Sequence, residues 1–477
     1  MDYKKINNSF KVFTISVFLI LLLPQMFQEG LFMDGLIYSS ISNNLSKGEG
    51  SFWFPKFSET VLTNFHEHPP LQFGVQSLIF KIFGNDFYVE KIYSGFTGLL
   101  TALLIILIWK KINKGNRYTE MYWLPVLFWV TIPRVFWSYN NNMLENTMGL
   151  FSLAAVYILL LAIGKIYWKR ILYFIAVSIL LCLSFLSKGF PGLYPLGFFF
   201  CYYIAYSKSF GFKSMITNSF LLLLTLISIS VIYLILNHKA LESISNYLHT
   251  QVLASIEGKG RVGSRFALLY DLLQQILIMM IICATLILLN LKNFIKVIKQ
   301  NKGIFHILLL FFLIGLSASL PLMISPKLSA FYLVPSLPFF AIFFALMISD
   351  IVNTYMGRIN HRSLKFKFLD YFSYLLIVSV ATYSIINYGN TCRDKELIAD
   401  INKIGNILPV KSTISVQQSF YSRWSLMGYF QRKFQINIDR SGRQNEYLLI
   451  EKTEPEIDGY EDTELQLLKF KLLKHIR

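Results

Sequence analysis

The chain has 477 residues, of which 54% are hydrophobic and 15% are charged. Soluble domains carry about 25% charged residues, so this composition excludes the soluble classes and indicates a polytopic membrane protein. The formal net charge of +18 would suit a nucleic-acid partner. However, Lys and Arg concentrate in short loops between apolar segments, as the positive-inside rule describes. We therefore expect a lipid bilayer as a partner and no nucleic acid.

The apolar segments form a regular series of spans. About 11 of them are long enough to cross roughly 30 Å of hydrocarbon when length and flanking charges are considered together. They cover approximately residues 12–29, 93–109, 121–137, 147–163, 171–187, 190–206, 216–236, 268–290, 304–322, 331–349 and 368–388. The basic stretch Met1–Lys11 places the N-terminus in the cytoplasm, and the first span lacks a small-residue cleavage site, so we expect it to be retained. Each major basic loop then lies on the cytoplasmic side.

The first long polar interruption, residues 30–73, follows the first span directly. It carries Asp34 and the cluster HEHPP at residues 66–70. Loops without a function are usually short, so a long loop that collects acids, histidines and aromatic residues is a candidate site. The apolar spacing after Asp34 predicts a short amphipathic helix on the membrane surface. The segment LQFGVQSLIFKIFG, which ends at Gly84, is too short to span and predicts a second interfacial helix.

Residues 390–477 differ in character, since they are polar and charged and contain no spanning run. Helical periodicity is present over Lys395–Ile407. Strand-like stretches follow at Thr413–Val416, Phe434–Ile438 and Glu446–Ile450. We therefore predict an all-α polytopic membrane domain over residues 1–389 and a small external α/β domain over residues 390–477.

Ionisable residues at the outer ends of spans are candidates for a site, because such groups are costly in a membrane unless they face a cavity or a partner. They are Asp34, His66, Glu67, His68, Glu145, Lys188, Arg261, Arg265 and Lys327. Asp34 suits a cleft between two helices, but it suits a solvated helix cap equally well. Lys188 and Lys327 are placed to bind an anionic headgroup. Alternatively, their side chains only extend to the membrane interface, where the charge is hydrated. Glu145 either faces the helix bundle or is the exposed start of the fourth span.

The cluster at residues 66–70 also has side chains that bind metals. His66 and His68 are close together in an irregular loop, and without a known third ligand they are a weak metal signal. The two prolines that follow stiffen the chain and would hold the side chain of His68 in place. A divalent metal ion therefore stays an open alternative at this stage.

Several motifs occur in a defined order along the chain. They are Asp34 in MDGLIYSSIS, the Pro-Pro motif in HEHPPLQFGVQSLIFKIFG, Lys91 at the start of a span, Glu145 in MLENTMGLF, Lys188 in FLSKGFPGLYPL, and Lys327 and Tyr332 in SPKLSAFYLVPSLPFFAI. Over about residues 12–350 this order resembles the GT-C class of integral-membrane glycosyltransferases. The nearest groups are the bacterial relatives of protein O-mannosyltransferases and the transferases that add aminoarabinose to lipid A. Gly35 departs from the pattern, because the family often has a second acid there, and Glu145 replaces the usual Asp.

The resemblance implies an inverting transferase that moves a sugar from a polyprenyl-phosphate donor to lipid A, a protein hydroxyl or another glycan. It implies a multi-pass protein of the bacterial inner membrane that acts at the periplasmic face. Asp34 would be the general base or orient the acceptor, with Glu67 and Glu145 as further catalytic acids. The residues expected to stabilise the departing phosphate are His68, Lys188, Arg261, Arg265, Lys327 and Tyr332. Some family members hold a metal through the acid before the Pro-Pro motif, here Glu67, with a later histidine, here His238 or His249.

Two competing functions involve the same class of lipid. A flippase for a lipid-linked saccharide would also need basic groups in a cavity, but transporters usually show internal repeats, which this sequence lacks. An O-antigen-type ligase or polymerase would also use polyprenyl-linked glycans outside the cytoplasm. The largest external loop of those proteins usually comes late in the chain, whereas here the prominent loop is the first. A transferase is therefore the favoured prediction.

Overall fold

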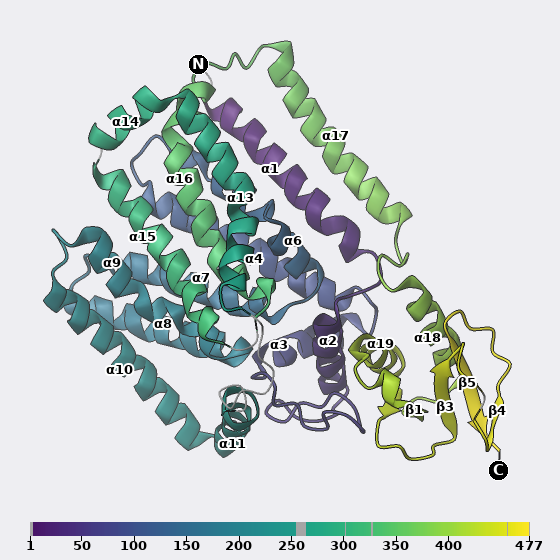
Figure 1. The fold of residues 1–477 in the computed structure, drawn as a ribbon. Coiled ribbons are helices and arrows are strands. Elements are labelled where there is room, and N and C mark those ends of the chain that lie inside the picture. The colour runs from purple at the N-terminus through teal and green to yellow at the C-terminus, as the bar shows by residue number, and fades with distance from the viewer. Residues whose placement is uncertain (1–2, 254–263, 301, 326–327, 456, 477) are drawn as a thin grey trace. The chain divides into compact units, whose positions relative to one another are not determined.

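The structure consists mainly of helices, with one small sheet formed by the C-terminal residues (Figure 1). The computed structural model describes residues 3–253, 264–300, 302–325, 328–455 and 457–476. The chain divides into two compact units, each assembled from segments that are separate in the sequence. The membrane unit comprises Met1–Pro24, Gly95–Tyr139 and Leu144–Tyr383, and the loop–sheet unit comprises Gln25–Ser94, Asn140–Met143 and Ser384–Arg477.

Nine helices among the described residues are long and apolar enough to cross a membrane, so the chain is a multi-pass membrane protein. They are α1 (Tyr3–Met26), α4 (Val89–Ile112), α7 (Leu144–Ala162), α8 (Tyr167–Lys188), α10 (Phe212–Leu236), α13 (Ala267–Leu289), α15 (Lys302–Ser319), α16 (Leu337–Met356) and α17 (Leu364–Ile386). Shorter elements lie between them: η1 (Thr119–Met121), α5 (Trp123–Val130), α6 (Pro133–Asn140), η2 (Phe190–Gly197), α9 (Phe198–Tyr206), α11 (His238–Tyr247), η3 (Leu248–Leu253), α14 (Leu291–Gln300), η4 (Leu320–Ile324) and η5 (Ala330–Ser336). The long helices confirm most of the predicted spans, with ends that differ by several residues.

Two segments that were predicted as single spans are each divided. Residues 121–137 form the end of η1, then α5 and most of α6, and residues 190–206 form η2 and then α9. Proline is the physical reason, because it lacks an N–H group and its ring clashes with the preceding helical turn. Pro133 begins α6, while Pro191 and Pro195 lie in the 3-10 helix η2. Length and hydropathy alone therefore overestimated the number of continuous spans.

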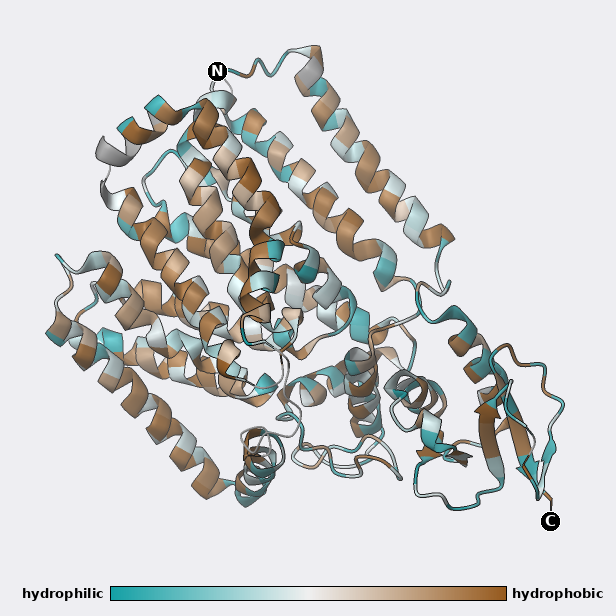
Figure 2. Cartoon of the chain, viewed as in Figure 1, coloured by the Kyte–Doolittle hydropathy of each residue, from teal (hydrophilic) through white to brown (hydrophobic). Residues whose placement is uncertain are grey.

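The helices of the membrane unit differ strongly in burial. The span that contains α16 is 78% buried, whereas the spans formed by α10 and α17 are 11% and 17% buried, so α16 is central and the other two are peripheral. The peripheral helices expose mainly apolar side chains (Figure 2). Apolar surface of this extent would be unfavourable in water and suits contact with lipid.

Charged residues gather at the end of the membrane unit where α1 begins. Lys11 Nζ lies 2.9 Å from Glu120 Oε2. Arg117 pairs with Asp350, to which the Tyr118 hydroxyl donates a hydrogen bond of 2.8 Å. These contacts bring the loop after α4 and part of α16 to the N-terminal side of α1.

The C-terminal residues form a small mixed sheet with two helices. Its elements are α18 (Lys395–Ile407), β1 (Thr413–Val416), η6 (Gln418–Phe420), α19 (Trp424–Phe434), β2 (Asn437–Asp439), β3 (Tyr447–Glu451), β4 (Tyr460–Asp462) and β5 (Phe470–His475). The strand order is β2-β1-β3-β5-β4, with β1 parallel to β2 and β3, and β5 antiparallel to β3 and β4. The predicted helix and the predicted strands Thr413–Val416 and Glu446–Ile450 are confirmed as α18, β1 and β3. The predicted strand Phe434–Ile438 overlaps β2 only at residues 437 and 438, because Phe434 still belongs to α19, and α19, β4 and β5 were not predicted.

The first polar loop contains both helices that its sequence predicts, α2 (Met33–Ser46) and α3 (Leu71–Phe83). Most of α2 is buried, because α3 and α19 pack against it. On α3 an apolar stripe of Val75, Leu78 and Ile82 remains exposed. This stripe recurs at helical spacing and suits the predicted position at a membrane interface.

The segment between α2 and α3 is held by hydrogen bonds to the C-terminal residues. Thr60 Oγ1 donates to the Ile438 carbonyl at 2.7 Å, and Lys47 Nζ donates to Gln435 Oε1 at 2.9 Å. Lys411 Nζ lies 2.9 Å from Glu49 Oε1. The loop and the sheet therefore fold as one unit, although more than 300 residues separate them in the sequence.

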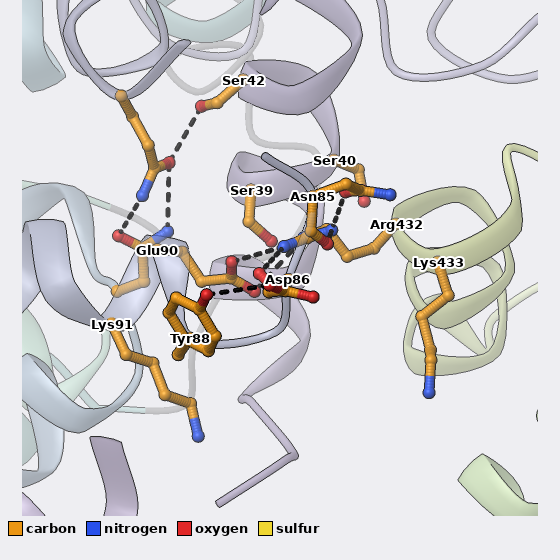
Figure 3. Close-up of polar contacts among 12 residues, drawn as sticks. Ser39, Ser40, Ser42, Asn85, Asp86, Tyr88, Glu90, Lys91, Arg432 and Lys433 are labelled. Atoms are coloured by element: carbon orange, nitrogen blue, oxygen red, sulfur yellow. Dashed lines mark hydrogen bonds and ion pairs between the residues drawn. The ribbon is translucent and has the colours of Figure 1, made fainter. Parts of the chain in front are cut away.

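A buried ion pair lies at the centre of the loop–sheet unit (Figure 3). Arg432 of α19 reaches Glu90 at the start of α4, with Nη2 and Oε2 2.7 Å apart, and the two side chains are 4% and 3% exposed. The same guanidinium donates to the backbone carbonyl groups of Asn85 at 3.1 Å and Asp86 at 2.8 Å, and to the Asn85 side chain. Arg432 thus pairs with the buried Glu90 carboxylate and also donates to acceptors of the exposed residues Asn85 and Asp86.

We expect Arg432→Met to destabilise the loop–sheet unit, because it leaves Glu90 as an unpaired buried carboxylate. Removing one partner of a buried pair costs about 3–5 kcal/mol. Thermal unfolding in detergent, with trypsin cleavage of the C-terminal residues as a local readout, measures the effect. Lys469→Gln is the control, since the Lys469–Glu396 pair is solvent-exposed at 3.3 Å. Equal stability of the two variants would contradict the assigned role of Arg432.

Candidate active site

Lys188, the last residue of α8, forms a buried ion pair with Glu145 in the first turn of α7. The side chain of Lys188 is 7% exposed and that of Glu145 is 0% exposed. The two helices pack against each other over much of their length, and the Ser152 and Ser184 hydroxyl groups lie 2.7 Å apart in this contact. A single charge at such a position would be costly, so each partner stabilises the charged form of the other.

Gly189 ends α8 and sets the direction in which the chain leaves Lys188. Its φ is +89°, which residues with a Cβ rarely adopt, and a Cβ there would overlap the Tyr247 hydroxyl of α11. Burial raises the pKa of Tyr247 to about 12, so this hydroxyl keeps its proton at neutral pH. The Lys-Gly pair of the sequence therefore has a structural explanation, since only glycine fits directly after the lysine.

Aromatic rings lie beside the Lys188 ammonium. Nζ is 4.5 Å from the centre of the Tyr332 ring and 5.4 Å from that of Phe331, within the range of cation–π attraction. Phe331 stacks on Trp137 of α6, with ring centres 5.8 Å apart. The Arg134 guanidinium lies 4.9 Å from the Trp137 ring and adds a second cation that the sequence did not single out. We call Glu145, Lys188, Phe331 and Tyr332 the lysine cluster.

Asp34 lies half-buried in the first turn of α2, where the helix dipole favours a negative charge. Phe32 occupies the N-cap position of α2. Asp34 is therefore not the helix-capping residue that the alternative interpretation of the sequence predicted. Tyr38 is four residues further along and shares a face of α2 with Asp34. The ring of Tyr38 contacts the ring of His68 edge-on, with centres 5.8 Å apart. The structure therefore brings Asp34 and His68 to one side of α2.

Gly35 follows Asp34 at a point where the backbone is tightly packed. A Cβ at this position would overlap the carbonyl oxygen of Asn141. The Asn141 side chain accepts a hydrogen bond of 2.8 Å from the Phe32 amide, which holds the two segments together. No side chain fits at position 35. This explains physically why the second acid of the GT-C pattern is replaced here by glycine.

The other predicted site residues that the structure describes lie in the loop before α3 and in the membrane unit. Glu67 is exposed on the loop before the two prolines, and the ring of His66 contacts Phe54 instead, with centres 5.7 Å apart. In the membrane unit, Arg265, His238 at the start of α11 and His249 in η3 are all exposed. Two further predicted residues, Arg261 and Lys327, lie outside the described residues.

The predicted metal ligands were tested against the geometry. Over the described part of the chain, no group of three or more His, Cys, Asp or Glu side chains is placed to hold a metal ion. Glu67 belongs to the loop–sheet unit, whereas His238 and His249 belong to the membrane unit, so a metal ion held by these residues stays a prediction.

Two polar residues of the loop–sheet unit were not predicted to have a structural role. Lys91 is 1% exposed, and its Nζ donates to the carbonyl groups of Gln25, in the last turn of α1, at 2.7 Å and of Gln28, just after α1. Asn142 has a positive φ of 53° and accepts a hydrogen bond of 3.0 Å from Gln76 of α3. Two features of the sequence could have indicated these structural roles: a lysine at the start of an apolar span and a run of three asparagines between two spans.

A cavity of about 210 Å³ lies beside the Arg432–Glu90 pair. Its lining also includes the carboxyl groups of Glu29 and Asp86 and the ammonium of Lys433. Lys433 pairs with Glu29 at 2.6 Å. Sites for ligands usually measure about 300–1,000 Å³, so this cavity is small for a lipid-linked sugar. We therefore do not place the donor there.

Comparison with protein-family models finds no match, and comparison with curated proteins finds none either. Solved structures do match. ArnT from Cupriavidus metallidurans in the apo state has a TM-score of 0.65 at 12% identity, over 97% of each chain. The same protein bound to undecaprenyl phosphate has a TM-score of 0.64. The oligosaccharyltransferase AglB from Archaeoglobus fulgidus, in complex with an inhibitory peptide and a dolichol-phosphate, has a TM-score of 0.54 at 13% identity, over 92% of this chain and 65% of AglB.

ArnT and AglB are both GT-C glycosyltransferases. The chain has the GT-C fold. This confirms the fold that the order of motifs predicted, and the match to ArnT extends through the C-terminal residues because it covers 97% of each chain. At this level of identity the likeness is one of backbone architecture.

We expect Gly35→Ala to destabilise the protein, because the added methyl group would force Asn141 away from α2. Overpacking of this kind costs about 1–3 kcal/mol. Thermal unfolding in detergent measures the change. The matched control is Gly211→Ala, since nothing lies within 4 Å of a Cβ at Gly211, and we expect that variant to stay within about 0.5 kcal/mol of wild type. A wild-type melting temperature for Gly35→Ala would disprove the close packing.

Proposed function

We propose that this protein is a glycosyltransferase that uses a sugar linked to a polyprenyl phosphate. The observation that carries the proposal is the buried Lys188–Glu145 pair beside the rings of Phe331 and Tyr332. A cation at the end of a span, in an aromatic and largely water-free setting, suits a lipid-linked phosphate, which lies at the level of the headgroups. The GT-C fold supports the same class of reaction.

In the proposed reaction Lys188 binds the phosphate of the donor. The negative charge on that phosphate increases as the bond to the sugar breaks, so a fixed cation stabilises the transition state more than the ground state. Glu145 was predicted as a catalytic acid, but its pairing with Lys188 favours a positioning role. It holds the ammonium in place before the donor arrives.

Asp34 is proposed as the group that activates or orients the acceptor. An oxygen of the acceptor attacks the anomeric carbon and forms the new glycosidic bond, while the bond from that carbon to the phosphate oxygen breaks and polyprenyl phosphate leaves. If the acceptor is a hydroxyl group, its proton passes to the Asp34 carboxylate. Attack opposite to the leaving group inverts the configuration of the sugar. His68, on the same side of α2, is proposed to contact the phosphate.

We propose a chemical class for the acceptor and a membrane face for the reaction. Lipid A, a protein hydroxyl and a glycan each offer an oxygen that can attack. The matched ArnT structure contains undecaprenyl phosphate, and the matched AglB structure contains dolichol-phosphate and a peptide. By the positive-inside argument the N-terminus is cytoplasmic, so the reaction is assigned to the opposite, periplasmic face of the bacterial inner membrane.

A flippase or an O-antigen-type ligase is the second candidate, because either would also bind polyprenyl-linked saccharides. One observation favours the transferase: Asp34 lies in the first turn of α2, on the side of the helix where the Tyr38 ring meets that of His68. A carboxylate on the same side of a helix as a histidine suits acid–base chemistry at a fixed position. A transport path would instead need polar groups distributed along the depth of the membrane.

We expect Asp34→Asn to reduce transfer by about 10²–10⁴-fold, because the amide cannot accept a proton. The substitution preserves size, so donor binding and expression should stay close to wild type. Turnover of a polyprenyl-phosphate-sugar by purified protein, with acceptors of each class supplied separately, is the measurement. Asp458→Asn, which changes an exposed acid, serves as the control. Wild-type turnover by Asp34→Asn would remove Asp34 from the mechanism.

We expect Lys188→Ala to lose about tenfold or more in donor affinity, because a charge-assisted hydrogen bond to phosphate is lost. Mass spectrometry of lipids that co-purify with the detergent-extracted protein provides the measurement. Lys208→Ala, an exposed lysine, is the control.

A second variant addresses folding, because Lys188→Ala leaves Glu145 buried without its cation. Lys188→Met combined with Glu145→Gln removes both charges and should restore stability but not donor binding. Polyprenyl-phosphate-sugar on the wild type that is absent from both variants would support the proposal. A polyprenyl-diphosphate oligosaccharide would favour the ligase or flippase, and donor retained by both variants would move the phosphate site elsewhere.

A further inference from the structure

A second cavity, of about 400 Å³, lies between α1 and α17 in the membrane unit. Lys5 lies near the start of α1 and Lys367 near the start of α17, so the cavity is at the end where both helices begin. Its charged lining residues are Lys5, His361, Lys367 and Asp370, and Tyr371 and Tyr374 contribute phenol groups. None of these residues belongs to the lysine cluster or to the side of α2 that carries Asp34.

The helix α17 is loosely attached to the rest of the membrane unit. Only 17% of its apolar span is buried, although it runs beside α1 (Figure 1). The two helices leave an opening instead of interlocking side chains at their first turns. An opening of this kind between two spans needs an occupant, because side chains at a membrane interface otherwise lose contacts on that side.

The charges of the cavity identify the chemistry of the occupant. Lys5 and Lys367 carry two positive charges, His361 adds a hydrogen-bond donor, and Asp370 supplies one negative charge. The neighbouring loop contributes Arg358 and Arg362, so the surroundings are strongly basic. Lysine side chains near the ends of spans attract the anionic lipids of the adjacent leaflet. Tyrosine rings are likewise enriched at headgroup level.

We propose that this cavity binds the headgroup of an anionic phospholipid from the leaflet on the N-terminal side. Lys5 and Lys367 hold the phosphate from opposite helices, and His361 donates to it from the chain before α17. The acyl chains follow the apolar surface of α17, where Phe368, Leu375 and Val378 are exposed (Figure 2). This apolar continuation selects a phospholipid over free phosphate. The bound lipid joins α17 to α1.

The test is native mass spectrometry of the full-length, delipidated protein, titrated separately with phosphatidylglycerol, phosphatidylethanolamine and inorganic phosphate. We expect the wild type to retain phosphatidylglycerol about tenfold more strongly than the zwitterionic lipid, and inorganic phosphate not to compete. The double variant Lys5→Gln/Lys367→Gln should lose this preference. Asp370→Asn should strengthen it, because a repulsive carboxylate is removed.

The matched control is Lys208→Gln/Lys213→Gln, which removes two positive charges from exposed positions distant in sequence from the cavity. It should keep the wild-type preference. Equal loss in both double variants would show a general effect of net charge and overturn the site. Equal retention of the two lipids by the wild type would also overturn it, and displacement by inorganic phosphate would show an anion site without lipid selectivity. None of these outcomes depends on transferase activity.

Discussion

The pair formed by Lys188 and Glu145 is the interaction on which the membrane part of the candidate site depends. Where water is scarce, neither charge is tolerated alone, so the ends of α7 and α8 must pack with the two side chains in contact. Gly189 must then turn the chain away directly after the lysine, because Tyr247 occupies the space that any larger residue would need. The aromatic neighbours stabilise the cation without introducing further buried polar groups.

In the loop–sheet unit, buried polar groups are likewise paired, here by hydrogen bonds between segments that are distant in the sequence. Arg432 satisfies Glu90 and the backbone around Asn85, while Asn141 and Gly35 fix the start of α2. The long first loop is therefore ordered by its contacts with α19 and β2. Its length serves both the position of Asp34 and the attachment of the C-terminal sheet.

The likeness to ArnT at 12% identity shows how little of such a fold rests on particular residues. A span requires length, hydropathy and basic ends, and many sequences meet these requirements. Packed cores also tolerate wide substitution when size and pattern are kept. Positions such as Gly35, Gly189 and Lys188 tolerate fewer residue types. At the two glycines no side chain fits, and at Lys188 the charge must pair with Glu145.

Much of the fold could be predicted from the sequence, because hydropathy and charge act locally. The long spans, α2, α3, α18 and the strands β1 and β3 were predicted from local patterns. The breaks at Pro133 and in η2 were not, although prolines were visible there, because tertiary packing determines whether a span continues past a proline. The strands β4 and β5 were missed because their short sequences carry charged residues, and only the pairing of β5 with β3 and of β4 with β5 stabilises them.

The sequence by itself determined that this is a membrane protein with polar chemistry at the ends of its spans, and it singled out Asp34, Glu145 and Lys188. Only the tertiary structure decided which of these residues meet. It paired Lys188 with Glu145 and placed His68 beside the Tyr38 ring. The physical reason is that hydropathy is a property of each segment, whereas a pair of charges depends on contacts between residues far apart in the chain.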